Sequence, residues 1–259
     1  VVGAAGRMGR MLTATLLADS GIEVVGAVDR ADAPGAGEDI GTLAGRGAVG
    51  VTIGSDLGKV VDLAQVVVEF SAPAASAEHA ELVASRGRAM VIGTTGLSDA
   101  QLARVRAASA SAPILVAPNM SLGVNVLLKL LPLITTALGE GYDIEIVETH
   151  HRGKKDAPSG TALKLGEVVA EARGKRLQDV AVHGRSGIQP RAPGEIGFHA
   201  IRAGANVGDH TVIYSNEGEQ IEITHRAFSR ETFALGALRA CKWIVGRAPG
   251  LYSIQDVIG

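Results

Sequence analysis

Three glycines at three-residue spacing near the start of the chain restrict its fold more than any other feature. Gly3, Gly6 and Gly9 lie in the stretch GAAGRMG, between a short apolar run and an amphipathic segment. Glycine lets the backbone turn tightly and approach a ligand closely, and the helix that follows presents unpaired N–H groups to an anion. The spacing is a variant of the commoner G-x-G-x-x-G pattern, so its meaning depends on the surrounding sequence.

The first 121 residues alternate short apolar runs with helical segments. Strands are predicted over 22–28, 66–70, 89–93 and 113–117, and helices over 9–19, 73–86 and 98–110. Strands that are apolar almost throughout are expected where helices cover both faces of a parallel sheet. Ser98 and Gln101 predict a capping box at the start of the third helix. This order predicts an α/β domain with a Rossmann-like, doubly wound parallel sheet.

An acid follows the second predicted strand at the position where such a domain binds a ribose. Asp29 lies 20 positions beyond Gly9 (29 − 9), and a carboxylate there binds a ribose hydroxyl of a dinucleotide. The neighbouring guanidinium of Arg30 can accept a 2′-phosphate. We therefore expect NADH or NADPH as cofactor, with the preference open. Arg7 faces either a phosphate or the ribose edge. The alternative is a tight turn with Asp29 and Arg30 on the surface.

Two further strand ends carry small, hydroxyl and amide side chains that suit the nicotinamide end of a dinucleotide. Ligands of doubly wound sheets bind outside the carboxyl ends of the strands. The same residues are common turn formers, so plain turns are the alternative. The expected cofactor contacts are Gly3, Ala4, Ala5, Gly6, Arg7, Met8, Asp29, Arg30, Gly93, Thr94, Thr95, Ala117, Pro118, Asn119 and Met120.

The pattern changes after Asn119 and predicts a second α+β domain with a mixed or antiparallel sheet. Helices are expected over 121–138 and 160–173, strands at 143–149 and near 197–203, 207–215 and 219–227, and a mobile or wrapping loop over 184–197. Asn216-Glu217-Gly218 predicts a hairpin between the last two strands. We assign residues 1–121 to the first domain and 122–230 to the second, with the closing helix in 231–259 packing back on the first.

The densest polar cluster runs from Glu148 to Thr161. His150 and His151 end a predicted strand, so they point to opposite sides. Arg152, Lys154 and Lys155 add positive charge, and the stretch then opens a helix whose free N–H groups suit an anion. Such a loop fits a substrate that carries carboxylates, and histidine and lysine can supply protons. The alternatives are a solvated charged face and a purely capping role for Ser159.

Composition narrows the classes of function. A net charge of −2 and 3% aromatic residues disfavour nucleic-acid binding. One cysteine excludes an internal disulfide and agrees with a reducing, cytoplasmic compartment. No zinc-like spacing accompanies the paired histidines, so no metal is expected. The other histidines are interpreted as structural: His79, His183, His199, His210 and His225. No apolar run long enough to span a bilayer and no secretory leader are expected, and several natural residues are expected before Val1.

With these motifs in view, nearly the whole chain resembles the dihydrodipicolinate reductase family, also called 4-hydroxy-tetrahydrodipicolinate reductase. The segments that carry the resemblance are VGAAGRMGR, VIGTTG, APNMSLGVN, ETHHRGKKDAPSGTA and EITHRAFSRETFALGA. The resemblance implies reduction of a cyclic imine dicarboxylate in the diaminopimelate and lysine pathway with NADH or NADPH. It also implies a homotetramer assembled through the second domain's sheet, and a hinge between the domains.

The same resemblance implies roles for individual residues. His150 matches the proton donor or acceptor and Lys154 the proton-donating lysine. The expected substrate contacts are His151, Ser159, Gly160 and Thr161. Gly153, Lys155 and Met120 depart from the family pattern, which changes the charge of the loop and a cofactor contact but not the reaction class. Alternative functions are another Rossmann dehydrogenase acting on a small anionic substrate, a non-catalytic dinucleotide-binding regulator, and a metal hydrolase.

Overall fold

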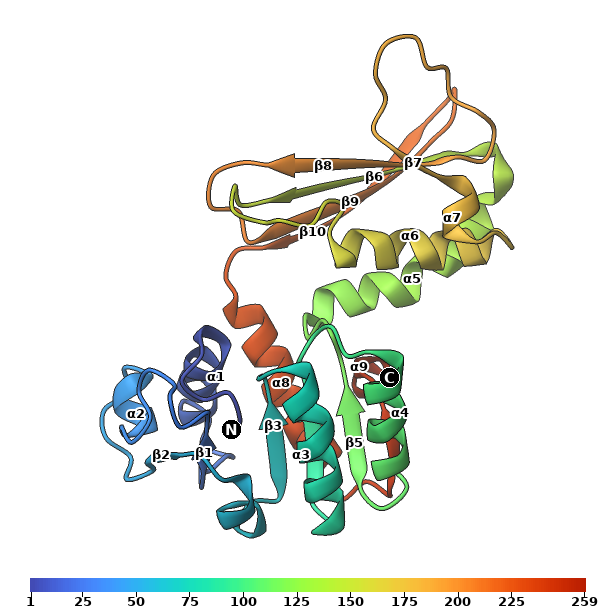
Figure 1. Ribbon diagram of the computed structural model, residues 1–259. Helices are drawn as coiled ribbons and strands as arrows, with labels where there is room; N and C mark the ends of the chain where they lie inside the picture. Colours follow the sequence, from blue (N-terminus) through green and yellow to red (C-terminus); the bar gives the residue numbers. More distant parts are fainter. The chain divides into compact units, whose positions relative to one another are not determined.

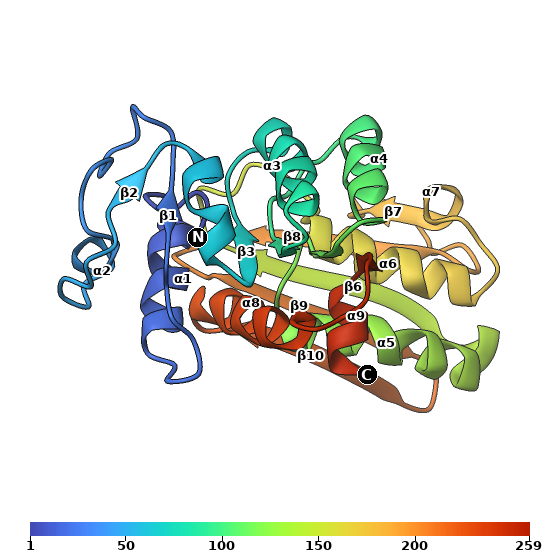
Figure 2. The ribbon, with the colours of Figure 1, turned by 90° about the horizontal axis from the view of Figure 1, so that it is seen from below.

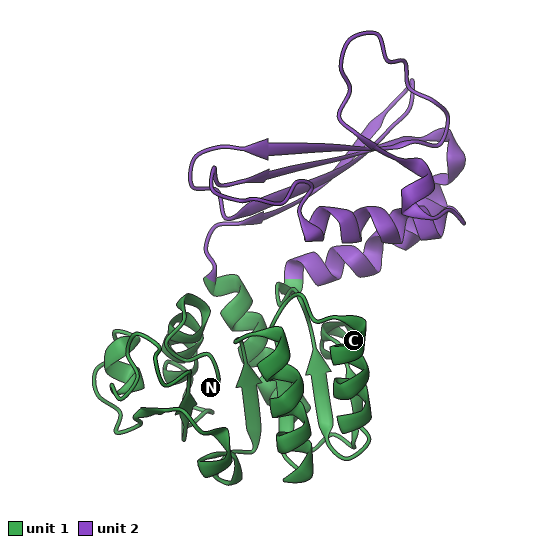
Figure 3. Ribbon diagram, in the orientation of Figure 1, with its two compact units in different colours: residues 1–122, 231–259 green, residues 123–230 purple.

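The computed structural model describes residues 1–259 and divides into two compact units (Figure 3). Unit 1 comprises Val1–Leu122 and Glu231–Gly259, and unit 2 comprises Gly123–Arg230. The last part of the chain therefore belongs with the first.

Unit 1 is a parallel α/β unit (Figure 1). Val2 forms parallel bridges with both Val28 and Glu69, so the first residues lie between the strand that ends at Val28 and the strand that ends at Glu69. The strand that holds Val28 lies on one side of Val2, and the strand that holds Glu69 lies on the other. The strand order therefore reverses at Val2, and the turn after it is a topological switch point. The elements are α1 (Arg7–Leu17), β1 (Ala27–Val28), α2 (Ile40–Leu43), β2 (Ile53–Gly54), β3 (Val66–Glu69), α3 (Pro73–Ser85), β4 (Ala89–Ile92), α4 (Asp99–Ala108), β5 (Pro113–Val116), α8 (Glu231–Ile244), β11 (Gly250–Tyr252) and α9 (Ile254–Ile258).

Helices cover both faces of this sheet, as the apolar strands predict. One core joins α1, α8 and α9 to one face, for example through Leu12 and Ala237. The other joins α3 and α4 to the opposite face through Ala80 and Val105. Figure 2 shows α3 and α4 side by side. The predicted capping box of Ser98 is present at the start of α4. The fold class predicted for the first domain is confirmed.

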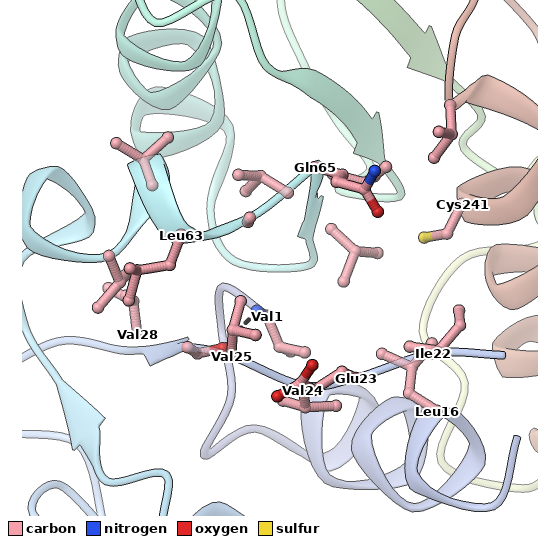
Figure 4. A pocket seen from close by; sticks show the side chains of 18 of the residues that line it. Val1, Leu16, Ile22, Glu23, Val24, Val25, Val28, Leu63, Gln65 and Cys241 are labelled. Atoms are coloured by element: carbon pink, nitrogen blue, oxygen red, sulfur yellow. Dashed lines mark hydrogen bonds between the residues drawn. The ribbon is translucent and has the colours of Figure 1, made fainter. Parts of the chain in front are cut away.

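A groove of about 600 Å³ opens at the amino ends of β1 and β3 (Figure 4). Residues 22–25 line one side without forming a sheet ladder, and residues 65–68 line the other. The strand predicted over 22–28 is therefore wrong in extent, since only Ala27–Val28 has a partner strand. The physical reason is that a strand needs a neighbour for its hydrogen bonds, and residues 22–25 have none. This groove lies at the end of the sheet opposite to the glycine loop.

Unit 2 is a five-stranded mixed sheet in the order β10-β9-β6-β8-β7. β6 runs antiparallel to β9 and parallel to β8. The Asn216 side chain accepts the N–H groups of Gly218 and Glu219, which forms the predicted hairpin turn. The elements are α5 (Leu122–Leu138, whose first residue lies in unit 1), β6 (Asp143–His150), α6 (Gly160–Ala172), α7 (Leu177–Val180), β7 (Ala181–His183), β8 (Ile196–Arg202), β9 (Gly208–Ser215) and β10 (Gln220–Ala227).

One face of this sheet is covered and the other has no helix (Figure 1). Leu131 of α5 and Leu165 of α6 pack against Ile144, Ile146 and Val212 of the covered face. Burial therefore alternates along β6 and β9 with a period of two. Glu148 and His150 continue this alternation at the end of β6. Their side chains therefore lie on the covered face and are buried, although both are polar.

One helical stretch, Leu122–Gly141, is long and apolar enough to cross a membrane by length and composition. This overturns the expectation that the chain has no such run. Leu127 and Leu131 of this stretch pack in the core of unit 2, and core helices of globular domains pass the same test. The stretch is therefore a weak indication of a membrane span.

Candidate functional site

The glycine loop of unit 1 has a geometry that only glycine permits. Gly3 has φ +74°, and a Cβ there would lie 2.3 Å from the carbonyl oxygen of Phe70. A Cβ on Gly9 would lie 2.1 Å from the carbonyl oxygen of Gly3. Gly6 is the N-cap of α1, and the first turn therefore has no side-chain hydrogen bond from its cap residue. Arg7 and Met8 begin α1, and Ala4 and Ala5 form the turn before it.

Asp29 is joined directly to this loop. Its Oδ2 accepts the N–H of Ala5 at 2.8 Å, and its Oδ1 accepts the N–H of Arg30 at 2.8 Å. The carboxylate is thereby held beside the loop, at the carboxyl end of β1. The Arg30 side chain is exposed and lies 3.8 Å from Asp32. The structure thus brings Asp29 and the glycine loop together, and it leaves the Arg30 guanidinium in solvent.

At the ends of β4 and β5, three of the predicted residues have buried side chains. Thr94 is buried, and its Oγ1 accepts the hydroxyl of Ser76 at 2.8 Å. Ala117 and Met120 are buried in the core. The side chains of these three residues are therefore committed to the protein. The other predicted residues of these two turns are Gly93, Thr95, Pro118 and Asn119, the last of which accepts the N–H of Ser121 at 2.9 Å.

A buried carboxylate at the end of β3 was missed by the sequence analysis. Glu69 is fully buried and accepts the N–H and the hydroxyl of Ser71, and it also binds Nδ1 of His79 at 2.7 Å. The sequence predicts only a structural role for His79. The signal that could have found the group is an acid at the end of an otherwise apolar strand, VVVE.

The residues of this edge fit a dinucleotide. The glycine loop lies at the switch point, the first turn of α1 has no side-chain cap, and Asp29 is fixed beside the loop. Backbone N–H groups at a helix start favour a pyrophosphate, and a carboxylate accepts hydrogen bonds from ribose hydroxyls.

The polar cluster of unit 2 is centred on the end of β6. Glu148 and His150 are two residues apart and share one face of the strand, and Oε2 of Glu148 lies 2.5 Å from Nδ1 of His150. Both side chains are buried. Arg202 of β8 donates from Nη1 to Oε2 and from Nη2 to Oε1 of Glu148, each at 2.8 Å. This is a bidentate pair, the stronger form of a carboxylate–guanidinium contact.

The charges of this cluster follow from its burial and its partners. Burial by itself raises the pKa of Glu148, but hydrogen bonds from Arg202 and His150 outweigh it and hold that pKa below its ordinary value. Burial lowers the pKa of His150, and the cations Lys154 and Arg202 lower it further against the opposing effect of Glu148. Near neutral pH the pair is therefore a carboxylate beside a neutral imidazole.

Lys154 lies in the loop that follows β6. Its Nζ is 2.9 Å from Oδ2 of Asp156, and the side chain is 22% exposed. The hydrogen bond from Lys154 lowers the pKa of Asp156. The N–H of Lys154 binds the carbonyl of His151, whose own N–H binds the carbonyl of Asn206 at 2.8 Å. The loop is thus held to the turn between β8 and β9.

The start of α6 meets the same cluster. Ser159 is its N-cap, as the alternative interpretation of that residue expects: its hydroxyl accepts the N–H of Ala162 at 3.1 Å. The N–H of Ser159 also donates to Oε1 of Glu148 at 3.0 Å. Gly160 and Thr161 form the first turn, and a Cβ on Gly160 would meet nothing within 4 Å. An open helix start therefore lies beside the Glu148–His150 pair.

His210 of β9 completes the cluster, although the sequence predicts only a structural role for this residue. Its Nε2 lies 3.0 Å from the hydroxyl of Ser159, and its ring contacts His150 edge-on at 5.1 Å between centroids. Burial lowers the pKa of His210 to about 4, so the ring is neutral. Glu148, Arg202 and His210 were all missed as site residues. The spacing of Glu148 from His150 on one strand was the available signal.

Comparisons with known proteins assign both halves of the chain to the same family. Residues 1–120 match the family profile "Dihydrodipicolinate reductase, N-terminus", and residues 123–258 match "Dihydrodipicolinate reductase, C-terminus". The chain belongs to the dihydrodipicolinate reductase family. The resemblance noted from the motifs is confirmed.

Relatives within this family match over their full length. The 4-hydroxy-tetrahydrodipicolinate reductase of Rubrobacter xylanophilus is 52% identical over 100% of this chain and 96% of its own length. That of Alkalilimnicola ehrlichii is 51% identical over 100% of this chain and 97% of its own. Among solved structures, dipicolinate-bound dihydrodipicolinate reductase from Paenisporosarcina sp. TG-14 has TM-score 0.78 and 23% identity, and covers 98% of this chain and 97% of that chain.

Proposed function

We propose that the chain reduces 4-hydroxy-tetrahydrodipicolinate to tetrahydrodipicolinate with NADH or NADPH, a step of diaminopimelate and lysine biosynthesis. Full-length relatives of about half-identical sequence carry the name of this reductase. The observation that supports the chemistry most directly is the convergence of His150, Lys154 and the start of α6 at one end of β6.

In this proposal unit 1 holds the dinucleotide. The glycine loop and the first turn of α1, which has no side-chain cap, bind the pyrophosphate, and Asp29 binds a ribose. The ends of β4 and β5, from Gly93 to Thr95 and from Ala117 to Met120, contact the nicotinamide end. When bound, the reduced nicotinamide supplies a hydride to the substrate.

Unit 2 holds the substrate and moves its protons. His151, Ser159, Gly160 and Thr161 bind the carboxylates, because backbone N–H groups at an open helix start and a nearby imidazole favour anions. Loss of the 4-hydroxyl as water needs an acid and releases one C–H proton of the ring to a base. The hydride that follows must then be balanced by one proton on the ring. Lys154 donates that proton, and the neutral imidazole of His150 accepts or passes one on.

Assembly and location are part of the same proposal. The face of the unit 2 sheet that lacks a helix carries half-buried residues such as Val147 and Thr149. A homotetramer formed through this sheet would bury them, and a cytoplasmic location would suit a biosynthetic enzyme. Size-exclusion chromatography with light scattering should give four times the mass of one chain, and a monomer would contradict the assembly.

The decisive experiment follows NADH and NADPH absorbance in parallel after freshly generated cyclic substrate is added. We expect oxidation of at least one dinucleotide, and none with simple aldehydes or hydroxy acids. Turnover of those compounds in place of the cyclic substrate would favour another dehydrogenase. Dinucleotide binding without any turnover would favour a regulator, and a bound metal found by elemental analysis would favour a metal hydrolase.

A further inference from the structure

Glu148 is the residue through which the parts of the unit 2 site are connected. Its side chain is 1% exposed, yet it makes contacts to three separate elements: His150 on its own strand, Arg202 on β8 and Ser159 at the start of α6. A carboxylate can only accept hydrogen bonds, so the nitrogen that faces it must carry a hydrogen. In neutral His150 that nitrogen is Nδ1, which leaves the lone pair on Nε2.

Arg202 keeps this carboxylate charged and fixed in orientation. Its two terminal nitrogens bind both oxygens of Glu148, and a planar fork of this kind restrains rotation as well as position. Arg202 also donates to the carbonyl oxygen of Asp156, and the Asp156 side chain pairs with Lys154. One guanidinium is therefore connected to both groups that are assigned to proton transfer.

The same carboxylate orders the anion-binding end of α6. Oε1 of Glu148 accepts the N–H of Ser159, the N-cap, while the Ser159 hydroxyl accepts the N–H of Ala162. With the first turn held in this way, the N–H groups that follow Ser159 keep a fixed direction. The ion pair thus connects the imidazole, the lysine loop and the helix start.

We propose that Glu148 and Arg202 are the positioning residues of the reductase: the guanidinium clamps the carboxylate, and the carboxylate holds His150 in the Nδ1–H tautomer with Nε2 free. This inference rests on the proposed function for its kinetic consequence only. The tautomer of His150 is a property of the protein alone, so it can be tested whether or not the substrate is the expected one.

A matched control exists on the same strand. Glu145 of β6 lies on the opposite face and binds Nε2 of His199 at 2.8 Å and Nη1 of Arg185 at 2.9 Å. Arg191 also binds it, so Glu145 is a carboxylate with arginine and histidine partners, like Glu148, but its histidine is outside the proposed site. Glu145→Gln removes a comparable network from the sheet without touching His150.

The experiment measures histidine tautomers by ¹⁵N NMR in the full chain labelled at histidine, together with kcat and KM. In the unmodified protein we expect His150 as the Nδ1–H tautomer. Glu148→Gln can donate from its amide to Nδ1, so we expect a shift toward Nε2–H and a fall in kcat of about 100-fold or more. The KM for the dinucleotide should be unchanged. Glu145→Gln should leave the His150 tautomer unchanged. Its kcat should stay within about twofold of that of the unmodified protein, because Glu145 shares no hydrogen-bond partner with Glu148.

Arg202→Lys is a second variant for the same measurements, and it can be used if Glu148→Gln fails to fold. It preserves a positive charge and removes the fork, so we expect a mixture of His150 tautomers and an intermediate kcat. An Nε2–H tautomer in the unmodified protein would overturn the proposal. So would an unchanged tautomer in both variants, or a loss of kcat in Glu145→Gln equal to that in Glu148→Gln. If the unmodified protein shows no turnover, the proposed function fails while the tautomer result still decides the positioning role.

Discussion

A Cβ on Gly208 would lie 2.9 Å from Nε2 of His150, so this glycine leaves the outer nitrogen of the imidazole uncovered. The inner nitrogen, Nδ1, is bound to Glu148. Nε2 is therefore the atom of His150 that remains for proton exchange with a ligand. Gly208 on β9 thus determines how much space is left beside the His150 imidazole at the end of β6.

Gly208→Ala tests this relationship. The added methyl group forces the imidazole to move, and a displacement of about 1 Å at a reacting group can reduce a rate about 100-fold. We expect kcat to fall by about that factor while NADH binding is unchanged, as measured by steady-state kinetics and fluorescence titration. Gly218→Ala, in the hairpin turn of the same sheet, is the control. A folded Gly208→Ala protein with full kcat would show that Nε2 needs no free space.

The proposed proton-transfer residues give a second prediction. His150→Gln and Lys154→Ala should each lower kcat by about 10²–10⁴-fold, the usual contribution of a positioned acid or base. Both residues lie in unit 2, so the Kd for NADH should change little. Lys155→Ala removes a neighbouring exposed cation and should have a much smaller effect. Unchanged kcat in either of the first two variants would refute its assigned role.

Asp29 should determine the relative affinities of the protein for NADH and NADPH. Its carboxylate lies beside the glycine loop, held by Ala5. Asp29→Asn retains an acceptor for Ala5 but loses the charge that strengthens a bond to ribose and repels a 2′-phosphate. We expect the Kd for NADH to rise roughly tenfold, in keeping with the loss of a charged hydrogen bond, and the Kd for NADPH to rise less. Glu38→Gln, at an exposed acid of the same unit, should change neither value in the same titrations.

His210 should make the protein less stable in acid. Its folded pKa of about 4 lies below the ordinary value of 6.5, so the unfolded chain binds a proton first. The stability contribution is complete above pH 6.5 and is lost as the pH falls toward 4, about 3 kcal/mol in all at 1.36 kcal/mol per unit. Burial is the main cause. His150 and His225 act in the same direction, and Glu148 and Asp209 oppose them.

Urea unfolding at pH 7.5 and pH 4.5 checks this expectation. The free energy of unfolding of His210→Asn should fall less between the two pH values than that of the unmodified protein. Equal losses in the two proteins would mean that other groups, such as His225, carry the acid sensitivity.

Much of unit 1 could be predicted from the sequence because its signals are local. Strands 66–70, 89–93 and 113–117 are apolar except for Glu69, as burial on both faces favours, and each is followed by a helix within a few residues. The extent of β1 was not predictable in this way. Residues 22–28 have the composition of a strand, but a strand also needs a partner, and only Ala27 and Val28 have one.

The sequence by itself determined the family, the glycine loop and the segment that carries His150 and Lys154, because each is a contiguous motif whose residue types specify its chemistry. The tertiary structure alone decided which residues from distant parts of the sequence bind and orient the side chains of that segment. Arg202 lies 54 positions from Glu148, and His210 lies 51 positions from Ser159. Such contacts depend on strand order and register in a mixed sheet. Strand order and register are set by packing of the whole unit, so they produce no periodic pattern and no short motif in the sequence.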